Sequence, residues 1–148
     1  MRRFVKQGAA ALLTAAVLPA LSAHADEVWQ DGPLTVIWEA EDVNGYAVFA
    51  FTIEDPKVHR TGRIFLYGLV GTDQDRATFG GYWVSTDPDR PACPMAVVDA
   101  YGEEAWAWGA VELTFDGPAF PTGWQAALGH CFYEAQEFWD VEPVLGAP

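Results

Sequence analysis

The sequence predicts an all-β protein, either an antiparallel β-sandwich or a small β-barrel of about seven strands, with one disulfide. Three observations support this prediction. Apolar and polar residues alternate on both sides of Asn44-Gly45, turn residues punctuate the rest of the chain at short intervals, and no helical segment is long enough for a βαβ unit. The chain contains neither an internal repeat nor a domain linker. We therefore expect a single β-rich domain, residues 26–148.

Residues 1–25 have the pattern of a cleavable signal peptide. Three basic residues at positions 2, 3 and 6 precede an apolar stretch over 9–21, and Ala23-His24-Ala25 resembles a small-x-small cleavage site. The apolar stretch is too short to span a bilayer comfortably. We therefore expect a periplasmic or secreted protein with no transmembrane segment after cleavage. The Arg2-Arg3 pair leaves the twin-arginine route open beside general export.

The clearest local signal is a β-hairpin over Leu34 to Glu54. Asn44-Gly45 favours a two-residue type I′ turn, because both residue types tolerate a positive φ. Val43 would then face Tyr46. This register pairs, on one mostly apolar face, Trp38 with Phe51, Val36 with Ile53 and Ala40 with Phe49.

The next elements follow in order along the chain. Asp55-Pro56 and Thr61-Gly62 are expected to bracket a turn that carries a basic cluster over 57–63, most simply a solvated turn and alternatively an anion site. In the strand after Gly71 to Arg76, the Gly80-Gly81 pair indicates a bulge or a close backbone approach. Residues 134–140 could be a short helix or an edge strand. The other expected strands cover 63–70, 77–85, 95–100, 105–115 and 124–133.

Cys93 and Cys131 are the two cysteines of the chain. In an oxidising compartment they most simply form one disulfide. The chain-entropy model gives a link across a loop of that length roughly 4 kcal/mol of stabilisation. The alternative is a reactive or metal-binding thiol pair.

Charge excludes one large class of function. The full chain carries 8 basic and 21 acidic residues, a formal charge of −13. Removing residues 1–25 takes away three basic residues and leaves 5 against 21, a charge of −16. Nucleic-acid binding needs a basic surface, so we exclude it. An acidic exported protein instead favours basic partners.

The scarcity of reactive residues argues against nucleophilic catalysis. Ser85 and Lys57 are the only serine and lysine in residues 26–148, and Ser85 lacks a G-x-S-x-G context. His59 and His130 are far apart in sequence and have no metal-ligand spacing, so zinc or copper is not expected. No cofactor is expected. Whether the protein is an enzyme stays uncertain, with a non-enzymatic role favoured.

The main alternative function is a small carboxylate-dependent hydrolase, with or without calcium. Its acids would be Glu39, Glu41 and Glu112, which lie in expected strands and could point into a groove. Calcium would need loop carboxylates, of which the candidates are Asp73 with Asp75 and Asp87 with Asp89. Acids on a sheet surface more often discourage edge pairing, and no spacing matches a known calcium loop.

The aromatic content favours a binding module. Residues 26–148 contain 20 aromatic residues, more than a small core readily accommodates, although a Trp-rich core is the alternative. Exposed aromatic rings suit a carbohydrate or an apolar small ligand, and the negative charge suits an unidentified basic protein. We expect the ligand-binding face to include Trp83, Trp106 and Trp108, with Asp99 and Glu112 as acidic neighbours.

Overall fold

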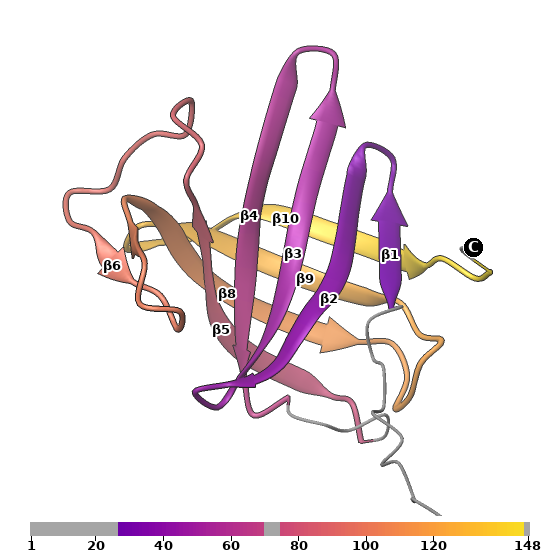
Figure 1. The fold of residues 1–148 in the computed structure, drawn as a ribbon. Helices are drawn as coiled ribbons and strands as arrows, with labels where there is room; N and C mark the ends of the chain where they lie inside the picture. The colour runs from indigo at the N-terminus through magenta and orange to yellow at the C-terminus, as the bar shows by residue number, and fades with distance from the viewer. Residues whose placement is uncertain (1–26, 70–74, 147–148) are drawn as a thin grey trace, which may run out of the picture.

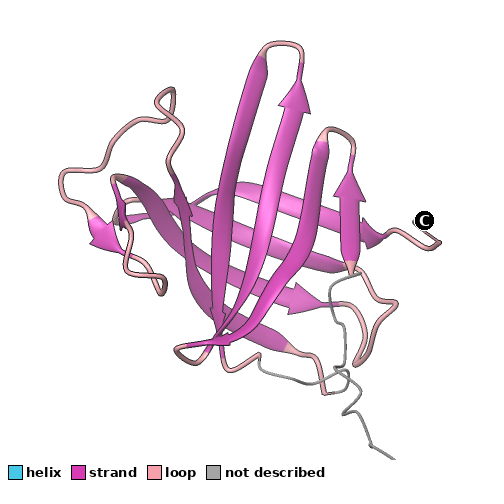
Figure 2. Cartoon of the chain, in the orientation of Figure 1, coloured by secondary structure: helices cyan, strands magenta, loops and turns pink. Residues whose placement is uncertain are grey.

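The computed structural model describes residues 27–69 and 75–146, and these contain strands and loops but no helix (Figures 1 and 2). The predicted all-β class is confirmed. The predicted signal peptide, residues 1–25, lies outside the described residues. The strands are β1 Val28–Asp31, β2 Leu34–Val43, β3 Tyr46–Asp55, β4 Val58–Tyr67, β5 Thr78–Ser85, β6 Val97–Val98, β7 Glu104–Ala105, β8 Ala107–Phe115, β9 Trp124–His130 and β10 Tyr133–Pro143.

In this part of the chain, eight strands close into an antiparallel barrel in the order β1-β2-β3-β4-β5-β8-β9-β10, with β10 pairing back to β1. The chain therefore runs up and down around the barrel, and the short hairpin β6–β7 is inserted between β5 and β8. Figure 1 shows β2, β3 and β4 crossing steeply in front of β8, β9 and β10. Closure leaves the barrel strands without a free edge.

The predicted register of the first hairpin is wrong, although its turn is right. Val43 faces Tyr46 across Asn44-Gly45, as expected. Trp38, however, pairs with Phe49 and not with Phe51, because the register shifts between Trp38 and Ala40 and again between Ala40 and Val43. Both shifts lie within β2. Together they move the pairing by two residues, so the apolar side chains of the two strands still share the barrel interior.

Three other boundaries differ from expectation. The basic cluster over 57–63 belongs mostly to β4, which begins at Val58, and is not a turn. Residues 134–140 lie within β10, which pairs with both β9 and β1 and so is neither a helix nor an edge strand. The short strand β1 was not expected at all. It completes the barrel between β2 and β10.

The barrel interior is filled by large apolar side chains. Trp29, Trp38, Trp83 and Trp124 are buried there, and the ring of Phe49 lies 5.2 Å from that of Trp29 and 5.1 Å from that of Trp38. Three of the indole N–H groups find backbone acceptors: Trp29 Nε1 donates to Thr122 O at 2.8 Å, Trp38 Nε1 to Ala40 O at 3.1 Å and Trp83 Nε1 to Gly129 O at 2.7 Å. An eight-stranded barrel is about wide enough for its side chains to fill it, as they do here.

An arginine lies near each end of this packed interior. Arg76 makes a bidentate ion pair with Glu27, with N–O distances of 2.7 and 2.8 Å, and its guanidinium lies 5.2 Å from the ring centroids of Trp38 and Phe115. Arg90 lies 4.4 Å from the ring centroid of Trp83, which is near the last residues of β5. Cation–π contact lets both charges lie beside buried indoles.

The predicted disulfide is confirmed. Cys93 and Cys131 are bonded, with Cα atoms 5.4 Å apart, and no described cysteine is free. The bond links the long segment between β5 and β6 to the β9–β10 turn. It therefore ties the inserted hairpin region to the barrel.

Candidate functional site

The hairpin β6–β7 covers part of the outer wall of the barrel. Beneath it, Val48, Phe65 and Val84 point outward from β3, β4 and β5 and are nevertheless buried, together with Ala105 of β7. Val97 and Ala100 of the hairpin pack against this cluster. The molecule thus has a second, smaller apolar core outside the barrel, and Figure 1 shows β6 standing to one side of the barrel strands.

Two hydrogen bonds hold the hairpin in this position. Asn44 Nδ2, at the β2–β3 turn, donates to Ala100 O at 2.8 Å, and Trp108 Nε1 donates to Met95 O at 2.8 Å. The carboxylate of Asp99 orders the hairpin loop, because its Oδ1 accepts from Tyr101 N and from Glu103 N, both at 2.9 Å. The hairpin is therefore anchored at its loop, at its entry and through the disulfide.

A groove of about 670 Å³ lies between this hairpin and the β9–β10 turn. We call it the outer-wall groove. Its floor comes from Tyr46, Tyr82 and Trp108 on the outside of the barrel, and its two rims come from Val97–Ala100 and Cys131–Tyr133. A mostly apolar groove of this size with few polar groups is typical of ligand-binding sites.

Ring contacts fix the aromatic floor. Tyr82 stacks on Phe65 at 4.9 Å, and Tyr46 meets Tyr82 edge to face at 5.6 Å. Trp108 meets Phe132 of the far rim edge to face at 5.0 Å. Edge-to-face and offset pairs are the favoured geometries of aromatic contacts, so these contacts stabilise the positions of the rings.

The backbone also approaches closely beneath the groove. Gly81 and Gly109, both in its lining, face neighbouring strands so tightly that a Cβ would collide with the carbonyl oxygens of Phe65 and Gly129 respectively. The close backbone approach expected at Gly80-Gly81 is confirmed at Gly81, whereas Gly80 has open space around its Cα. These two glycines therefore let the strands beneath the groove pack closely against each other.

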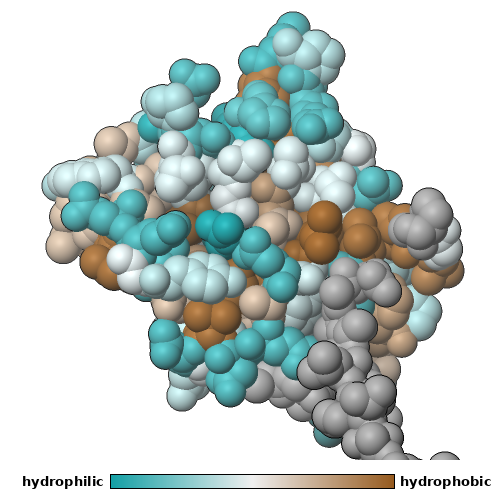
Figure 3. Space-filling model, in the orientation of Figure 1, coloured by the Kyte–Doolittle hydropathy of each residue, from teal (hydrophilic) through white to brown (hydrophobic). Residues whose placement is uncertain are grey.

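The rims of the groove expose large apolar side chains to solvent. Val98 is 67% exposed, Phe132 71% and Tyr133 68%. On the face seen in Figure 3, hydrophobic residues form separate patches among hydrophilic ones, so a single exposed apolar residue does not mark a site. What distinguishes the groove is that three such residues flank one aromatic floor.

The charge in the groove is negative. Among its described lining residues Asp99 is the one charged side chain, and none is basic. Burial chiefly, with smaller contributions from the nearby Tyr46 and Asp99, raises the pKa of Tyr82 to about 12, and the hydrogen bond with the backbone of Ala100 acts in the opposite direction. The phenol of Tyr82 is therefore neutral at physiological pH.

Of the five residues predicted for a binding face, the structure brings two together. Trp108 and Asp99 both line the outer-wall groove. Trp83 is only 1% exposed and points into the barrel, so it cannot belong to an exposed face. Trp106 is half exposed beside a separate hollow near Ser85 and Glu104, and Glu112 lies beside another hollow with Asp140. The three tryptophans therefore do not lie on one common face.

The sequence reasoning missed most of the floor and rim: Tyr46, Tyr82, Phe132 and Tyr133. One signal was available. Adjacent residues of a strand point to opposite faces, so one member of Tyr82-Trp83 had to face outward. The outward residue is Tyr82, because Trp83 donates its indole N–H to a backbone carbonyl inside the barrel. Phe132 and Tyr133 lie at a turn, where strand alternation carries no information.

Of the acids proposed for a hydrolase, Glu39 and Glu41 lie on β2, whereas Glu112 lies on β8. Glu39 forms a bidentate ion pair with Arg63, with Oε2 2.7 Å from Nε. Asp87, a calcium candidate, accepts hydrogen bonds from Thr61 N and from the hydroxyl of Ser85. Its partner Asp89 lies in the same loop. The other calcium candidate pair includes Asp73, which lies outside the described residues.

Comparison of the chain with protein-family models, with curated proteins and with solved structures finds no match. Within residues 27–69 and 75–146, no helix is long and apolar enough to cross a membrane. The groove must therefore be interpreted from its own chemistry.

Proposed function

We propose that this protein is an exported, non-enzymatic binding module. We propose that its outer-wall groove takes an extended, positively charged peptide segment of a partner protein. The observation that supports this most directly is the concentration of aromatic ring faces beside one carboxylate, with no basic side chain in the described lining. The disulfide Cys93–Cys131 and the export pattern of residues 1–25 support a periplasmic or secreted location.

Cation–π attraction explains why the occupant should carry a Lys or Arg side chain. Such a cation gains about 0.5–2 kcal/mol over the face of Trp or Tyr, more where water is excluded. Trp108, Tyr46 and Tyr82 present ring surface around the groove, and Asp99 adds a negative charge at its edge. The aliphatic stem of the same residue would lie against Val98 and Phe132.

Long-range charge supports the same occupant. Residues 26–148 carry 5 basic and 21 acidic side chains, so the field of the molecule attracts cationic segments and repels anionic ones. Of the five basic residues, Arg63, Arg76 and Arg90 are in ion pairs with Glu39, Glu27 and Glu137 respectively, which reduces their effect further. An acidic ligand would find no compensating cation in the groove.

A carbohydrate fits the groove less well. Sugar hydroxyls need several planar hydrogen-bonding groups around a stacking ring. Here the Asn44 amide donates to Ala100 O and one Asp99 oxygen accepts two backbone N–H groups, so these polar groups already hold the hairpin. The ring faces alone are less selective for sugars than for cations.

The test uses a synthetic peptide that alternates lysine and valine, with a glutamate-for-lysine peptide and a glucan oligosaccharide as competitors. Isothermal titration should detect binding of the lysine peptide only, weakening as salt rises. Replacing Phe132 should reduce affinity about tenfold, because it removes an apolar side chain from one rim of the groove. Phe138 is a matched control: it is 72% exposed, on the outside of β10, and lines a different hollow. Its replacement should change affinity less than about twofold.

Three outcomes would contradict the proposal. The oligosaccharide could bind where the lysine peptide does not. The two peptides could bind equally, which would indicate an apolar site without charge selection. Alternatively, Phe132→Ala and Phe138→Ala could have the same effect, which would place binding outside the groove.

A further inference from the structure

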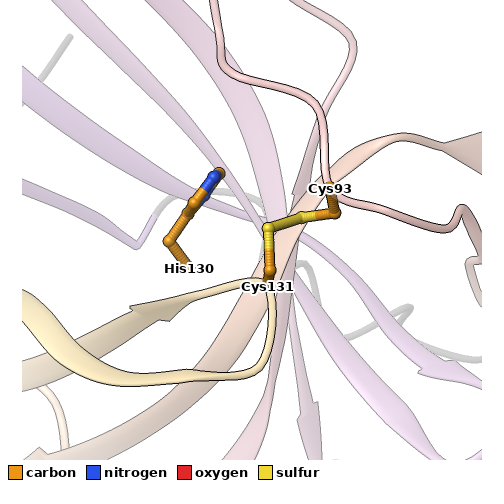
Figure 4. A group of neighbouring side chains, drawn as sticks. All are labelled: Cys93, His130 and Cys131. Carbon is orange, nitrogen blue, oxygen red and sulfur yellow. A yellow bond between two sulfur atoms is a disulfide. The ribbon is translucent and has the colours of Figure 1, made fainter.

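The disulfide has an unexpected neighbour. The imidazole of His130 lies beside Cys93 and Cys131, and a ring nitrogen and the two sulfurs all lie within 4.8 Å of one another. Figure 4 shows the side chains of His130 and Cys131 rising next to each other from consecutive positions, with Cys93 approaching from the opposite segment. No spacing in the sequence suggested this cluster, because Cys93 is 37 residues before His130.

We propose that Cys93, Cys131 and His130 form a zinc site when the disulfide is reduced. Two thiolates and one imidazole are a donor set that Zn²⁺ accepts readily, with water in the fourth tetrahedral position. The ligand atoms of one tetrahedral zinc are roughly 3.5–4 Å apart, given Zn–S near 2.3 Å and Zn–N near 2.1 Å. The cluster therefore needs only a small rearrangement once the S–S bond is gone.

The chemistry balances in two steps. A dithiol reductant transfers two electrons and two protons to the Cys93–Cys131 bond, which gives two thiols on the chain and one disulfide in the reductant. Zn²⁺ then displaces both thiol protons into solvent and forms two Zn–S bonds and one Zn–N bond. The oxidised protein offers only His130 and should not bind.

The surroundings of the cluster favour a neutral complex. His130 stacks on Trp83 at 6.0 Å, which orients the imidazole, and within the described residues its ring nitrogens have no hydrogen-bond or ion-pair partner. Arg90 lies over the same Trp83 ring at 4.4 Å and would repel an uncompensated dication. Two thiolates cancel the charge of Zn²⁺, so the complete site is compatible with this arginine.

A bound zinc ion would also replace the disulfide as the link between the hairpin region and the β9–β10 turn. Cys131 begins one rim of the outer-wall groove and Cys93 precedes the hairpin that forms the other. Linking both sulfurs through one ion would keep the two rims together in reducing conditions. The zinc site does not depend on the identity of the groove's ligand.

The test is a metal titration of the full chain. The protein is reduced with a dithiol, the reductant is removed without oxygen, and Co²⁺ is added as a spectroscopic probe before Zn²⁺ competition with a chelator. We expect one Co²⁺ per chain with thiolate charge-transfer and tetrahedral d–d absorption, and displacement by Zn²⁺. His130→Gln should bind Zn²⁺ at least about tenfold more weakly, since even outer-shell losses reduce affinity 10–100-fold. His59→Gln is the control, because His59 is exposed on β4, and it should bind like wild type.

Circular dichroism of the indole region checks that each reduced variant remains folded, and His130→Asn serves as a second variant. The proposal is overturned if reduced wild type shows no thiolate absorption with Co²⁺, or if it loses its folded signal and Zn²⁺ does not restore it. It is equally overturned if His130→Gln and His130→Asn bind Zn²⁺ as tightly as wild type, or if the Cys93→Ser/Cys131→Ser chain does.

Discussion

The barrel interior and the outer-wall groove are both rich in aromatic side chains, and they differ in how far those side chains are exposed to solvent. Inside, Trp29 and Trp83 donate their indole N–H groups to Thr122 O and Gly129 O and are enclosed by other side chains. In the groove, Trp108 also has a backbone acceptor, Met95 O, but Phe132 beside it is mostly exposed. The interior rings are enclosed by their neighbours, whereas the groove leaves apolar surface in water.

This difference explains where binding would occur in a barrel of this size. An eight-stranded barrel either holds a small ligand inside or fills itself with side chains, and here tryptophans fill it. The inserted hairpin β6–β7 packs on the outer wall of the barrel, and the groove lies between it and the β9–β10 turn. Interior aromatic residues should therefore govern stability, and groove residues should govern binding.

The largest expected effect is on an interior tryptophan. Trp83→Ala removes a buried ring, its hydrogen bond and the platform beneath Arg90. We expect a loss of about 3–5 kcal/mol in the free energy of unfolding, measured by urea denaturation. Trp106→Ala, at a half-exposed site outside both regions, should change it by less than about 0.5 kcal/mol. Similar losses for the two variants would mean that Trp83 is not a core residue.

The disulfide joins the two regions, and its removal should affect both. Cys93→Ala/Cys131→Ala opens a link across 38 residues, which the chain-entropy model values at about 4 kcal/mol and measured cases at typically 2–4 kcal/mol. Thermal unfolding in the presence and absence of a reductant checks the size. Wild type should lose stability when reduced and the variant should not. A variant as stable as oxidised wild type would show that packing alone holds the hairpin.

The pH dependence of stability should distinguish the groove floor from the interior. Burial raises the pKa of Tyr82 to about 12, above the unfolded value near 10. Below pH 10 the phenol is protonated in both states, so stability is unaffected. Between about pH 10 and 12 the unfolded chain loses this proton first, and stability falls as pH rises.

Tyr82→Phe should remove part of that alkaline loss, measured as the difference between the two urea midpoints across the range. Tyr101, in the same region of the molecule, should account for the rest of the alkaline loss of stability, because burial also raises its pKa. Parallel pH profiles for wild type and Tyr82→Phe would show that the phenol is hydrated and that the groove floor is wetter than its packing indicates.

The sequence predicted the fold well wherever strand periodicity and turn chemistry decide it. Asn44-Gly45 predicted the first turn correctly, and the presence of two cysteines, together with the expectation of export, predicted the disulfide. The register failed because irregularities within β2 shift the pairing twice, and Asp42 adopts a positive φ of 50° that no simple pattern at that position announces. Closure into a barrel depends on β1 pairing with β10, a contact between the two ends of the domain that local patterns cannot show.

The candidate site was predictable only in part, because it is assembled from distant segments. Asp99 and Trp108 were expected near each other and do share the groove. Trp83 was assigned to the wrong face because alternation gives two opposite faces without saying which is inside. The far rim comes from Phe132 and Tyr133 at the β9–β10 turn, and His130 approaches the two sulfurs from the same turn.

The smallest expected effect is the most informative about the groove. Phe132 is mostly exposed, so Phe132→Ala should change the free energy of unfolding by less than about 0.5 kcal/mol, and Phe138→Ala should do the same. Equal and small effects on stability, measured by urea denaturation, would mean that any difference between these variants in peptide affinity reports contact with the ligand. A loss above about 1.5 kcal/mol for Phe132→Ala alone would instead show that its edge-to-face contact with Trp108 supports the floor. The groove would then be an extension of the core, and the contrast between the two aromatic regions would disappear.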